Sequence, residues 1–397
     1  MKRLPAFLLA SLGALALLAP TAGQALAAGS GTAGPPPSVW YSADDLGTLG
    51  GTTSSASALD GDTVVGTSQL AGDATRHAFA YQLHSHTMTD LGTLGTSSQA
   101  VDVQGAYVVG TSALSDGGPV HAFAYSLPKH RMADIGTLGG SSADVAGISG
   151  RTVVGSSSLP GDTVAHAYAY DLNTRTMTDL GSLAGPAGSS SATAISGSIV
   201  VGTSTVPGAP GAARHGYAYD LTTRTMTDLG TLGGTYSTAH AVSGHTVVGQ
   251  SRTAGDSDVH GYAYDLGTGI RTDLGPDLKI GQIVGGRTAA GSDSLVAFTF
   301  DLVTHTIVTI PGRGVTEVNA MTGNLLVGNI FAVNSFAYIY DVRTAVRTDL
   351  PSLGGLNSHA VQLNRAGVVV GSAALPPPDS HTANGPYHAT VWRPHTG

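Results

Sequence analysis

Short apolar runs alternate with polar, glycine-rich segments along almost the whole chain after residue 38. Each run is about five to eight residues long, is rich in Val, Thr, Tyr and Ile, and is bounded by Gly, Asp, Asn or Ser. The segment HAYAY at 166–170 alternates aromatic residues with alanine, which is the period of two of a β-strand. No window after residue 38 shows the apolar period of a helix with its caps. The pattern predicts an all-β protein.

The strand-like runs belong to one repeated unit. HAYAYDLNTRTMTDLG at 166–181 returns as HAFAYQLHSHTMTDLG at 77–92 and as HGYAYDLTTRTMTDLG at 215–230. Anchors of the DLG type recur at spacings of 45, 44, 45, 49, 45, 36 and 40 residues, and they begin at Asp45, Asp90, Asp134, Asp179, Asp228, Asp273, near Thr309 in a degraded copy, and at Asp349.

Four short antiparallel strands in about 45 residues are the content of one β-propeller blade. A single blade cannot bury both of its faces, so the blades must stack around an axis. The alternative is a β-solenoid, which has shorter coils and two ends to cap. We predict a single propeller domain over residues 39–397 with about eight four-stranded blades. Seven is the alternative count, because units six and seven (273–348) are the shortest and carry Val296 and Phe336 where other units have His.

The last unit predicts how the ring closes. It contains three strand-like runs and lacks a TMTDLG strand, whereas SVWYSADD at 38–45 is a spare strand before the first anchor. Pairing of this strand with the last blade would cover two sheet edges. It would also place Trp40 and Trp392 on neighbouring strands. A free N-terminal strand is the alternative.

The beginning of the chain has the pattern of an export signal. Lys2 and Arg3 precede the apolar stretch 4–18, and Ala25-Leu26-Ala27 is a small-x-small cleavage site, so we expect a signal peptide over 1–28. The apolar stretch is short for a membrane span, although an uncleaved anchor is the alternative. Residues 29–38, GSGTAGPPPS, are expected to be a disordered Gly/Pro linker. These features predict a secreted protein with no membrane span after signal cleavage.

Composition narrows the classes of function. The chain has 56 Gly, no Cys, 11% charged residues and a formal net charge of −8. The absence of cysteine excludes disulfides and thiolate chemistry. No Lys/Arg cluster is present, which argues against nucleic-acid binding. We expect a monomer.

Several motifs recur in register from residue 45 to 397: H-A-F/Y-A-Y, D-L-G-T-L-G-G, and V-V-G-x-S between them. In these motifs the chain resembles the bacterial extracellular HAF repeat family, named after its His-Ala-Phe tripeptide. The resemblance implies export and a repeated β fold. It brings no catalytic residues.

Two repeated polar columns are interpreted as structural. Equivalent positions on neighbouring blades are too far apart to share one metal ion, which needs ligands at about 2 Å. We therefore expect each imidazole to hydrogen-bond backbone or the Asp of its unit, and each Asp to cap a tight Gly turn. No metal site or cofactor is predicted. The columns are His77, His121, His166, His215, His260 and His388, and Asp90, Asp134, Asp179, Asp228, Asp273 and Asp349.

A functional site is expected where the repetition lapses. On the predicted innermost strands one column is polar but different in each unit, and a second column lies two residues on. Both are candidates for lining the central channel and binding a ligand. The candidate residues from these columns are Gln99, Asp144, His240, Glu317, Asn319 and His359, and Asp102 is added as another unrepeated carboxylate on a predicted innermost strand. Glu317 is the only glutamate in the chain.

These observations leave two hypotheses for function. The first is an extracellular binding or scaffold module for an unknown glycan or protein, with Tyr236 and Tyr107 as candidate exposed aromatics. The second is a polysaccharide-degrading enzyme, a glycoside hydrolase or lyase. Glycoside hydrolysis needs two carboxyl groups about 5 to 10 Å apart, and an Asp144/Glu317 pair is expected to be wider than that.

Overall fold

The computed structural model describes residues 39–208, 213–293, 295–312, 314–378 and 384–396. The expected signal peptide, 1–28, and the expected linker, 29–38, lie outside the described residues. The chain from Val39 onwards forms one compact unit. Among the described residues, no helix is long and apolar enough to cross a membrane.

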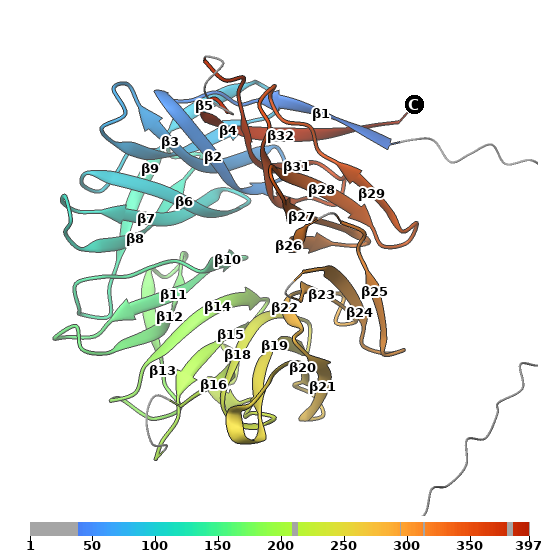
Figure 1. Ribbon diagram of the computed structural model, residues 1–397. Helices are drawn as coiled ribbons and strands as arrows, with labels where there is room; N and C mark the ends of the chain where they lie inside the picture. The colour runs from blue at the N-terminus through green and yellow to red at the C-terminus, as the bar shows by residue number, and fades with distance from the viewer. Residues whose placement is uncertain (1–38, 209–212, 294, 313, 379–383, 397) are drawn as a thin grey trace, which may run out of the picture. The chain divides into compact units, whose positions relative to one another are not determined.

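The described residues form seven sheets, six of four strands and one of eight. The eight-stranded sheet consists of two four-stranded blades, which are joined by a single parallel bridge between Arg214 and Tyr236. The fold is therefore an all-β propeller of eight blades, as the repeat predicted (Figure 1). Units six and seven each supply a full four-stranded blade.

The first four blades run in chain order from the innermost strand outward. Blade 1 is β2 (Gly50–Asp60), β3 (Thr63–Leu70), β4 (Arg76–Gln82) and β5 (Thr87–Asp90). Blade 2 is β6 (Ser97–Gln104), β7 (Tyr107–Ala113), β8 (Val120–Ser126) and β9 (Arg131–Gly136). Blade 3 is β10 (Gly147–Ser149), β11 (Thr152–Ser158), β12 (Ala165–Asp171) and β13 (Thr176–Gly181). Blade 4 is β14 (Ser190–Ser196), β15 (Ile199–Thr205), β16 (Arg214–Asp220) and β17 (Thr225–Asp228).

The other four blades follow the same plan, and the last one takes a strand from the other end of the chain. Blade 5 is β18 (Gly233–Ser243), β19 (Thr246–Thr253), β20 (Val259–Asp265) and β21 (Ile270–Pro276), with a short 3-10 helix, η1 (Ala254–Asp256). Blade 6 is β22 (Lys279–Val284), β23 (Thr288–Ser292), β24 (Ala297–Asp301) and β25 (Thr306–Thr309). Blade 7 is β26 (Val315–Thr322), β27 (Leu325–Phe331), β28 (Ser335–Asp341) and β29 (Val346–Asp349). Blade 8 is β30 (Ser358–Leu363), β31 (Val369–Ala374), β32 (Tyr387–Thr396) and β1 (Val39–Asp45).

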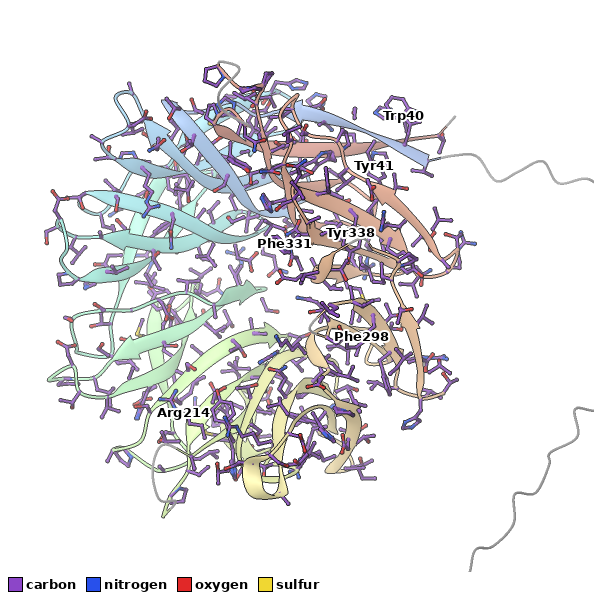
Figure 2. All side chains as sticks on the ribbon, viewed as in Figure 1. Trp40, Tyr41, Arg214, Phe298, Phe331 and Tyr338 are labelled. Atoms are coloured by element: carbon purple, nitrogen blue, oxygen red, sulfur yellow. The ribbon has the colours of Figure 1, made fainter. Side chains whose placement is uncertain are left out.

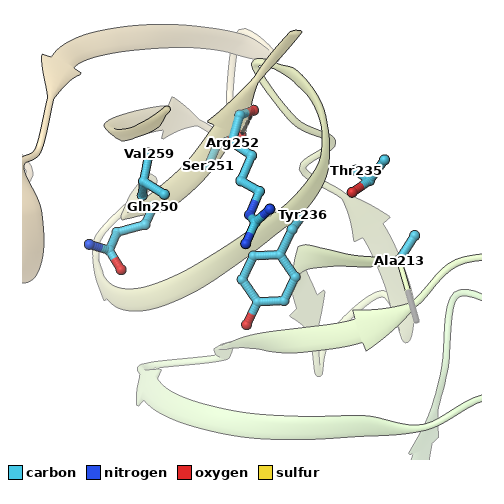
Figure 3. A pocket seen from close by; sticks show the side chains of 7 residues that line it. All are labelled: Ala213, Thr235, Tyr236, Gln250, Ser251, Arg252 and Val259. Carbon is cyan, nitrogen blue, oxygen red and sulfur yellow. Dashed lines mark hydrogen bonds between the residues drawn. The ribbon is translucent and has the colours of Figure 1, made fainter. Parts of the chain in front are cut away.

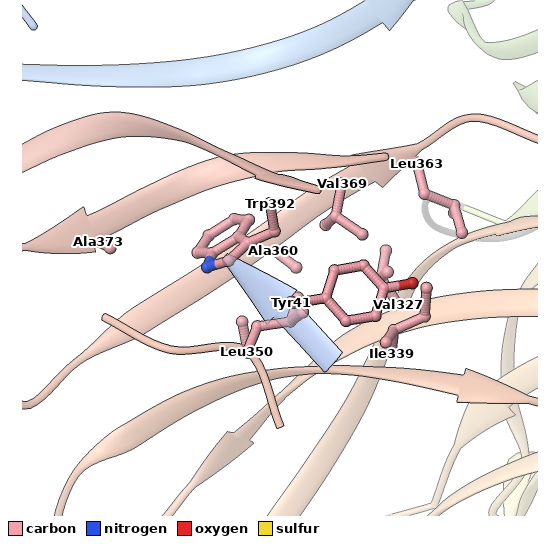
Figure 4. Packing of buried hydrophobic residues seen from close by; sticks show 10 residues of the cluster. Tyr41, Val327, Ile339, Leu350, Ala360, Leu363, Val369, Ala373 and Trp392 are labelled. Atoms are coloured by element: carbon pink, nitrogen blue, oxygen red, sulfur yellow. The ribbon is translucent and has the colours of Figure 1, made fainter. Parts of the chain in front are cut away.

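Strand β1 closes the ring by pairing antiparallel with β32, so the closure predicted from the incomplete last unit is confirmed. Figure 1 shows β1, in blue, alongside β32, in red. Side chains alternate along β1: Tyr41 is buried, whereas Trp40 is 52% exposed and stacks on His395. Figure 2 labels both residues at this edge of the ring. Figure 4 shows Tyr41 packed with Trp392 and with Val327 and Ile339 of blade 7.

Apolar clusters between neighbouring blades hold the ring together. The alternating aromatic and alanine residues of the third strands account for this packing: Phe79 of blade 1 packs with Val370 and Val391 of blade 8, across the point where the ring closes. The glycine of the V-V-G motif lets the strands pack this closely. A Cβ atom on Gly66 would lie 2.0 Å from the Ser55 carbonyl oxygen and 2.9 Å from the Phe79 ring.

Candidate functional site

Each repeated His makes a hydrogen bond to an Asp of its own blade. In five blades the Nδ1 atom lies 2.8 or 2.9 Å from the carboxylate, in the pairs His77–Asp90, His121–Asp134, His166–Asp179, His215–Asp228 and His260–Asp273. In blade 8 the partner of His388 is Asp45 of β1. Blade 7 has Phe336 at the position of the His, and its Asp349 binds the guanidinium of Arg347 at 2.9 Å.

The same aspartates also order the turn that leads to the next blade. The backbone N–H of Gly92 donates to Asp90 at 2.7 Å, and Gly92 has a positive φ of 73°, which glycine adopts readily. Because third strands begin and fourth strands end at these pairs, all six pairs lie on one face of the ring, which we call the His–Asp face.

A β-bulge interrupts the innermost strand in seven blades. The register shifts between Ala56 and Ala58 in blade 1, for example, and leaves Ser57 outside the regular ladder. In six of these blades the bulged residue belongs to the second variable column of the sequence, and in blade 6 it is Gly281. Bulges redirect side chains, and in four blades the bulged residue is polar and bonds to the neighbouring blade: Ser57, Thr193, His240 and Asn319.

Hydrogen bonds from innermost-strand side chains link every blade to the next, and we call this circuit the inner belt. The bonds are Ser57 Oγ to Ala100 O at 2.8 Å, Ile148 N to Asp102 Oδ2 at 3.1 Å, Gly197 N to Ser149 Oγ at 3.2 Å, Thr193 Oγ1 to Ala239 O at 2.7 Å, His240 Nδ1 to Ile280 O at 3.0 Å, Gln282 Nε2 to Asn319 O at 2.8 Å, Asn319 Nδ2 to Ala360 O at 2.6 Å, and Leu59 N to Gln362 Oε1.

Three of the seven candidate binding residues, Asp102, His240 and Asn319, belong to the inner belt. Burial raises the pKa of Asp102, against the opposing effect of N–H donors from Ile148 and Val103. Burial lowers the pKa of His240, whose Nε2 also accepts from Thr238. Their polar atoms are thus engaged between blades, and a role in ligand binding stays a prediction.

The other four candidates lie in the first variable column. Gln99, Asp144 and Glu317 are exposed, and His359 is half-buried. Asp144 accepts a hydrogen bond from Ser156 N at 2.6 Å, and partial desolvation is the main cause that raises the pKa of its carboxyl. Asp144 belongs to blade 3 and Glu317 to blade 7, so four of the eight blade steps separate them. They lie on opposite sides of the ring, and the structure does not bring them together.

Sequence reasoning missed two groups of residues. Lys279 is the member of the first variable column in blade 6, where it pairs with Ser292, and the degraded motifs of that unit hid it. Buried hydroxyls of the innermost strands were also missed. They accept N–H bonds from the preceding blade, as Ser98 does from Ala78 and Ser237 from Gly216, both within 2.9 Å. The signal for the second group was available, because a Ser or Thr precedes the first variable column in six of the eight units.

A groove on the His–Asp face between blades 4 and 5 is the strongest candidate for a binding site. Its volume is about 400 Å³, and it is lined by Ala213, Thr235, Tyr236, Gln250, Ser251, Arg252 and Val259. Tyr236 is 39% exposed, and Figure 3 shows its ring together with the side chains of Arg252 and Gln250 in the groove. No carboxylate is among these described lining residues.

The groove is held in shape by hydrogen bonds at its base. Both the N–H and the hydroxyl of Thr235 donate to the carboxylate of Asp256, at 2.7 and 2.6 Å. These bonds lower the pKa of Asp256, and Arg252 contributes in the same direction. The next residue, Tyr236, is fixed further by its bridge to Arg214. The tyrosine ring is therefore presented on an ordered backbone.

The groove lies where the repetition lapses. The register places Gln250 and Arg252 of β19 at the positions of Thr67 and Gln69 in blade 1. Tyr236 likewise takes the position of Thr53, one residue before the Ser that pairs with the second strand. The tyrosine, the arginine and the glutamine at this groove are thus departures from blade 1. Tyr107, the other aromatic candidate, is half-buried on the opposite face, under the guanidinium of Arg151 at 4.8 Å.

Within the described part of the chain, no group of three or more His, Asp or Glu residues is placed to hold a metal ion.

Comparison with known proteins supports the fold. No family model matches the sequence, and no curated protein is similar to it. The structure is similar to that of dipeptidyl peptidase 4 from Porphyromonas gingivalis, with a TM-score of 0.56, 10% identity and coverage of 86% of this chain and 57% of the other. It is also similar to a structure from a study of two prolyl endopeptidases, with a TM-score of 0.54, 11% identity and coverage of 83% of this chain and 55% of the other. Puromycin hydrolase gives a TM-score of 0.51, 12% identity and coverage of 74% and 52%. The chain thus spans a little over half the length of these proteins. At these identities the similarity concerns the fold alone.

Proposed function

We propose that this protein is an exported propeller that binds a neutral glycan in the groove between blades 4 and 5. The observation that supports this most is the exposed ring of Tyr236 beside Arg252 and Gln250. A sugar ring presents apolar C–H faces and a rim of hydroxyls, so it packs on an aromatic face while polar groups contact its edge. Arg supplies N–H donors, and Gln supplies both donors and an acceptor.

The charge of the chain favours a neutral polymer. The formal net charge is −8, which disfavours association with polyanions. Arg252 makes no ion pair within 4 Å among the described residues, so its guanidinium remains available to hydroxyl oxygens. The alternative ligand for the same groove is another protein.

Export is part of the proposal and rests on the sequence. The charged start, the apolar stretch and the small-x-small site of residues 1–28 have the form of a signal peptide, and the HAF resemblance implies the same location. The enzyme alternative has less support. Its two candidate carboxylates, Asp144 and Glu317, lie in opposite blades, whereas glycosidases need separations of about 5 to 10 Å.

The test is retention of the purified full chain on insoluble cellulose, chitin, xylan, mannan and β-1,3-glucan, with alginate beads as an anionic comparison. We expect retention on at least one neutral polymer and its loss in Tyr236→Ala. Tyr107→Ala is the matched control, because it removes a tyrosine from the opposite face. Retention on none of the neutral polymers, or equal retention of Tyr236→Ala, would contradict the proposal. Release of soluble sugar during the same incubation would favour the enzyme.

A further inference from the structure

A second hollow lies on the His–Asp face between blades 8 and 1 and extends to Gln99 of blade 2. Its volume is about 420 Å³, and its lining includes Thr53, Thr67, Gln69, Arg76, Gln99 and Tyr387. Like the first groove, it combines one tyrosine, one arginine, glutamine amides and hydroxyls. No carboxylate is among its described lining residues.

The strand register shows that the two hollows occupy equivalent places. Gln69 pairs with Arg76 in blade 1, as Arg252 pairs with Val259 in blade 5. Tyr387 begins the third strand of blade 8, as Arg214 begins that of blade 4. The first hollow thus has its tyrosine on blade 5, and the second has it on blade 8. Four of the eight blade steps separate the two hollows, so they lie half a turn apart on one face.

The polar groups of the second hollow are held in place and still have free hydrogen-bond donors. Gln69 Oε1 accepts from the hydroxyl of Thr53 at 2.6 Å, which fixes the amide and leaves its nitrogen as a donor. Arg76 is exposed and makes no ion pair among the described residues, and Gln99 is exposed beside it. These groups can donate to the hydroxyl rim of a sugar.

Tyr387 is also fixed by its neighbours. Its hydroxyl accepts from Asn357 Nδ2 at 2.8 Å. Its ring lies 5.9 Å from that of His359, which in turn lies 6.1 Å from Phe331. The three rings form a strip that leads from blade 7 to the hollow. The predicted candidate His359 is the middle ring of the strip, and the candidate Gln99 lines the hollow itself. An extended chain of sugars suits such a strip better than one small ligand does.

We propose that the hollow between blades 8 and 1 is a second glycan site and that the two sites hold one polysaccharide at two points. This inference rests on the proposed function, because both sites are assigned the same class of ligand. Two linked sites bind a polymer far more tightly than either site binds a short fragment, since the second contact forms at a high effective concentration.

The experiment compares the wild type with Tyr236→Ala, Tyr387→Ala and the double variant. Each is tested for retention on the five neutral polysaccharides and, by calorimetry, for binding of cellohexaose, chitohexaose, xylohexaose, mannohexaose and laminarihexaose. We expect two hexasaccharides per wild-type chain, one per single variant and none for the double variant. Each single variant should bind the polymer at least about tenfold more weakly than the wild type.

The outcomes separate this inference from the proposed function. One hexasaccharide per wild-type chain, lost only in Tyr236→Ala, would overturn the second site and leave the first standing. Loss only in Tyr387→Ala would overturn the first groove. Binding of none of the probes would overturn both. Arg76→Ala should also abolish binding at the second site. Because Arg76 is exposed, its substitution should not disturb folding, so loss of binding in this variant would show that misfolding of Tyr387→Ala is not the cause.

Discussion

Asp45, at the end of the first described strand, accepts a hydrogen bond at 2.8 Å from the imidazole of His388, which lies 343 residues further along the chain. In five other blades the equivalent partners are 13 residues apart. Strand β1 therefore supplies blade 8 with the Asp that its own repeat lacks. The repeated pair is completed in blade 8 by a strand from the other end of the chain.

Removal of the buried side chain of β1 should weaken the ring strongly. Tyr41 packs against Trp392 and blade 7, so Tyr41→Ala is expected to lower the free energy of unfolding by about 3 to 5 kcal/mol. Trp40→Ala is the neighbouring control: the ring is 52% exposed, and its loss should cost less than about 1.5 kcal/mol. Urea unfolding followed by circular dichroism measures both. Equal effects would show that closure does not depend on packing of β1.

The His–Asp pairs should differ in strength according to burial. His166 is almost fully buried, and its Nε2 also lies 3.0 Å from the Gly188 carbonyl oxygen. His166→Ala removes both contacts from a buried position and should cost about 2 kcal/mol. His215 is more exposed, so His215→Ala should cost less than about 1 kcal/mol. The reverse order in thermal or urea unfolding would argue against burial as the cause.

His240 should make stability depend on pH. Burial lowers the pKa of His240 below its unfolded value, so the neutral ring stabilises the fold above that unfolded value, and this contribution is lost as the pH falls through the folded pKa. His240→Thr keeps a donor of the kind that Thr193 uses in blade 4. The variant should lose less stability than the wild type between pH 7.5 and 5.5. Parallel loss in both proteins, measured by urea unfolding, would contradict this.

The V-V-G glycine should not tolerate a side chain. A Cβ atom on Gly66 would overlap the Ser55 carbonyl oxygen, so Gly66→Ala should cost about 3 kcal/mol or more, or prevent folding. Gly281 serves as the control, because a Cβ atom added to it would have no heavy atom within 4 Å. Gly281→Ala should change the unfolding free energy by less than about 0.5 kcal/mol. A stable Gly66→Ala protein would contradict the proposed packing.

The repeat predicted the fold because each unit contains the whole blade. The period of about 45 residues gave the four strands, and the missing TMTDLG strand after Trp392 indicated which segment closes the ring. The inner belt could not be predicted in the same way. It depends on bulges that redirect Ser57 or His240, and the sequence pattern does not distinguish a bulged residue from its neighbours.

The candidate site was only partly predictable for a similar reason. Tyr236 stands in TYSTAHAV, where an aromatic residue is as consistent with the core as with the surface, and its exposure depends on where β18 bridges blade 4. Glu317 was correctly located on an innermost strand, whereas Asp144 lies three residues before β10, and only the eight-blade count places the two opposite one another.

The inner belt has a consequence for how the protein opens. In a linear array of repeats, the terminal units have one neighbour and unfold at little free-energy cost, so amide exchange is fastest at the ends. A circuit that links all eight blades has no terminal unit. Local opening of any blade must break contacts with two neighbours, so amide protons of the innermost strands should exchange at similar rates in every blade, including blade 8, which is assembled from both ends of the described chain.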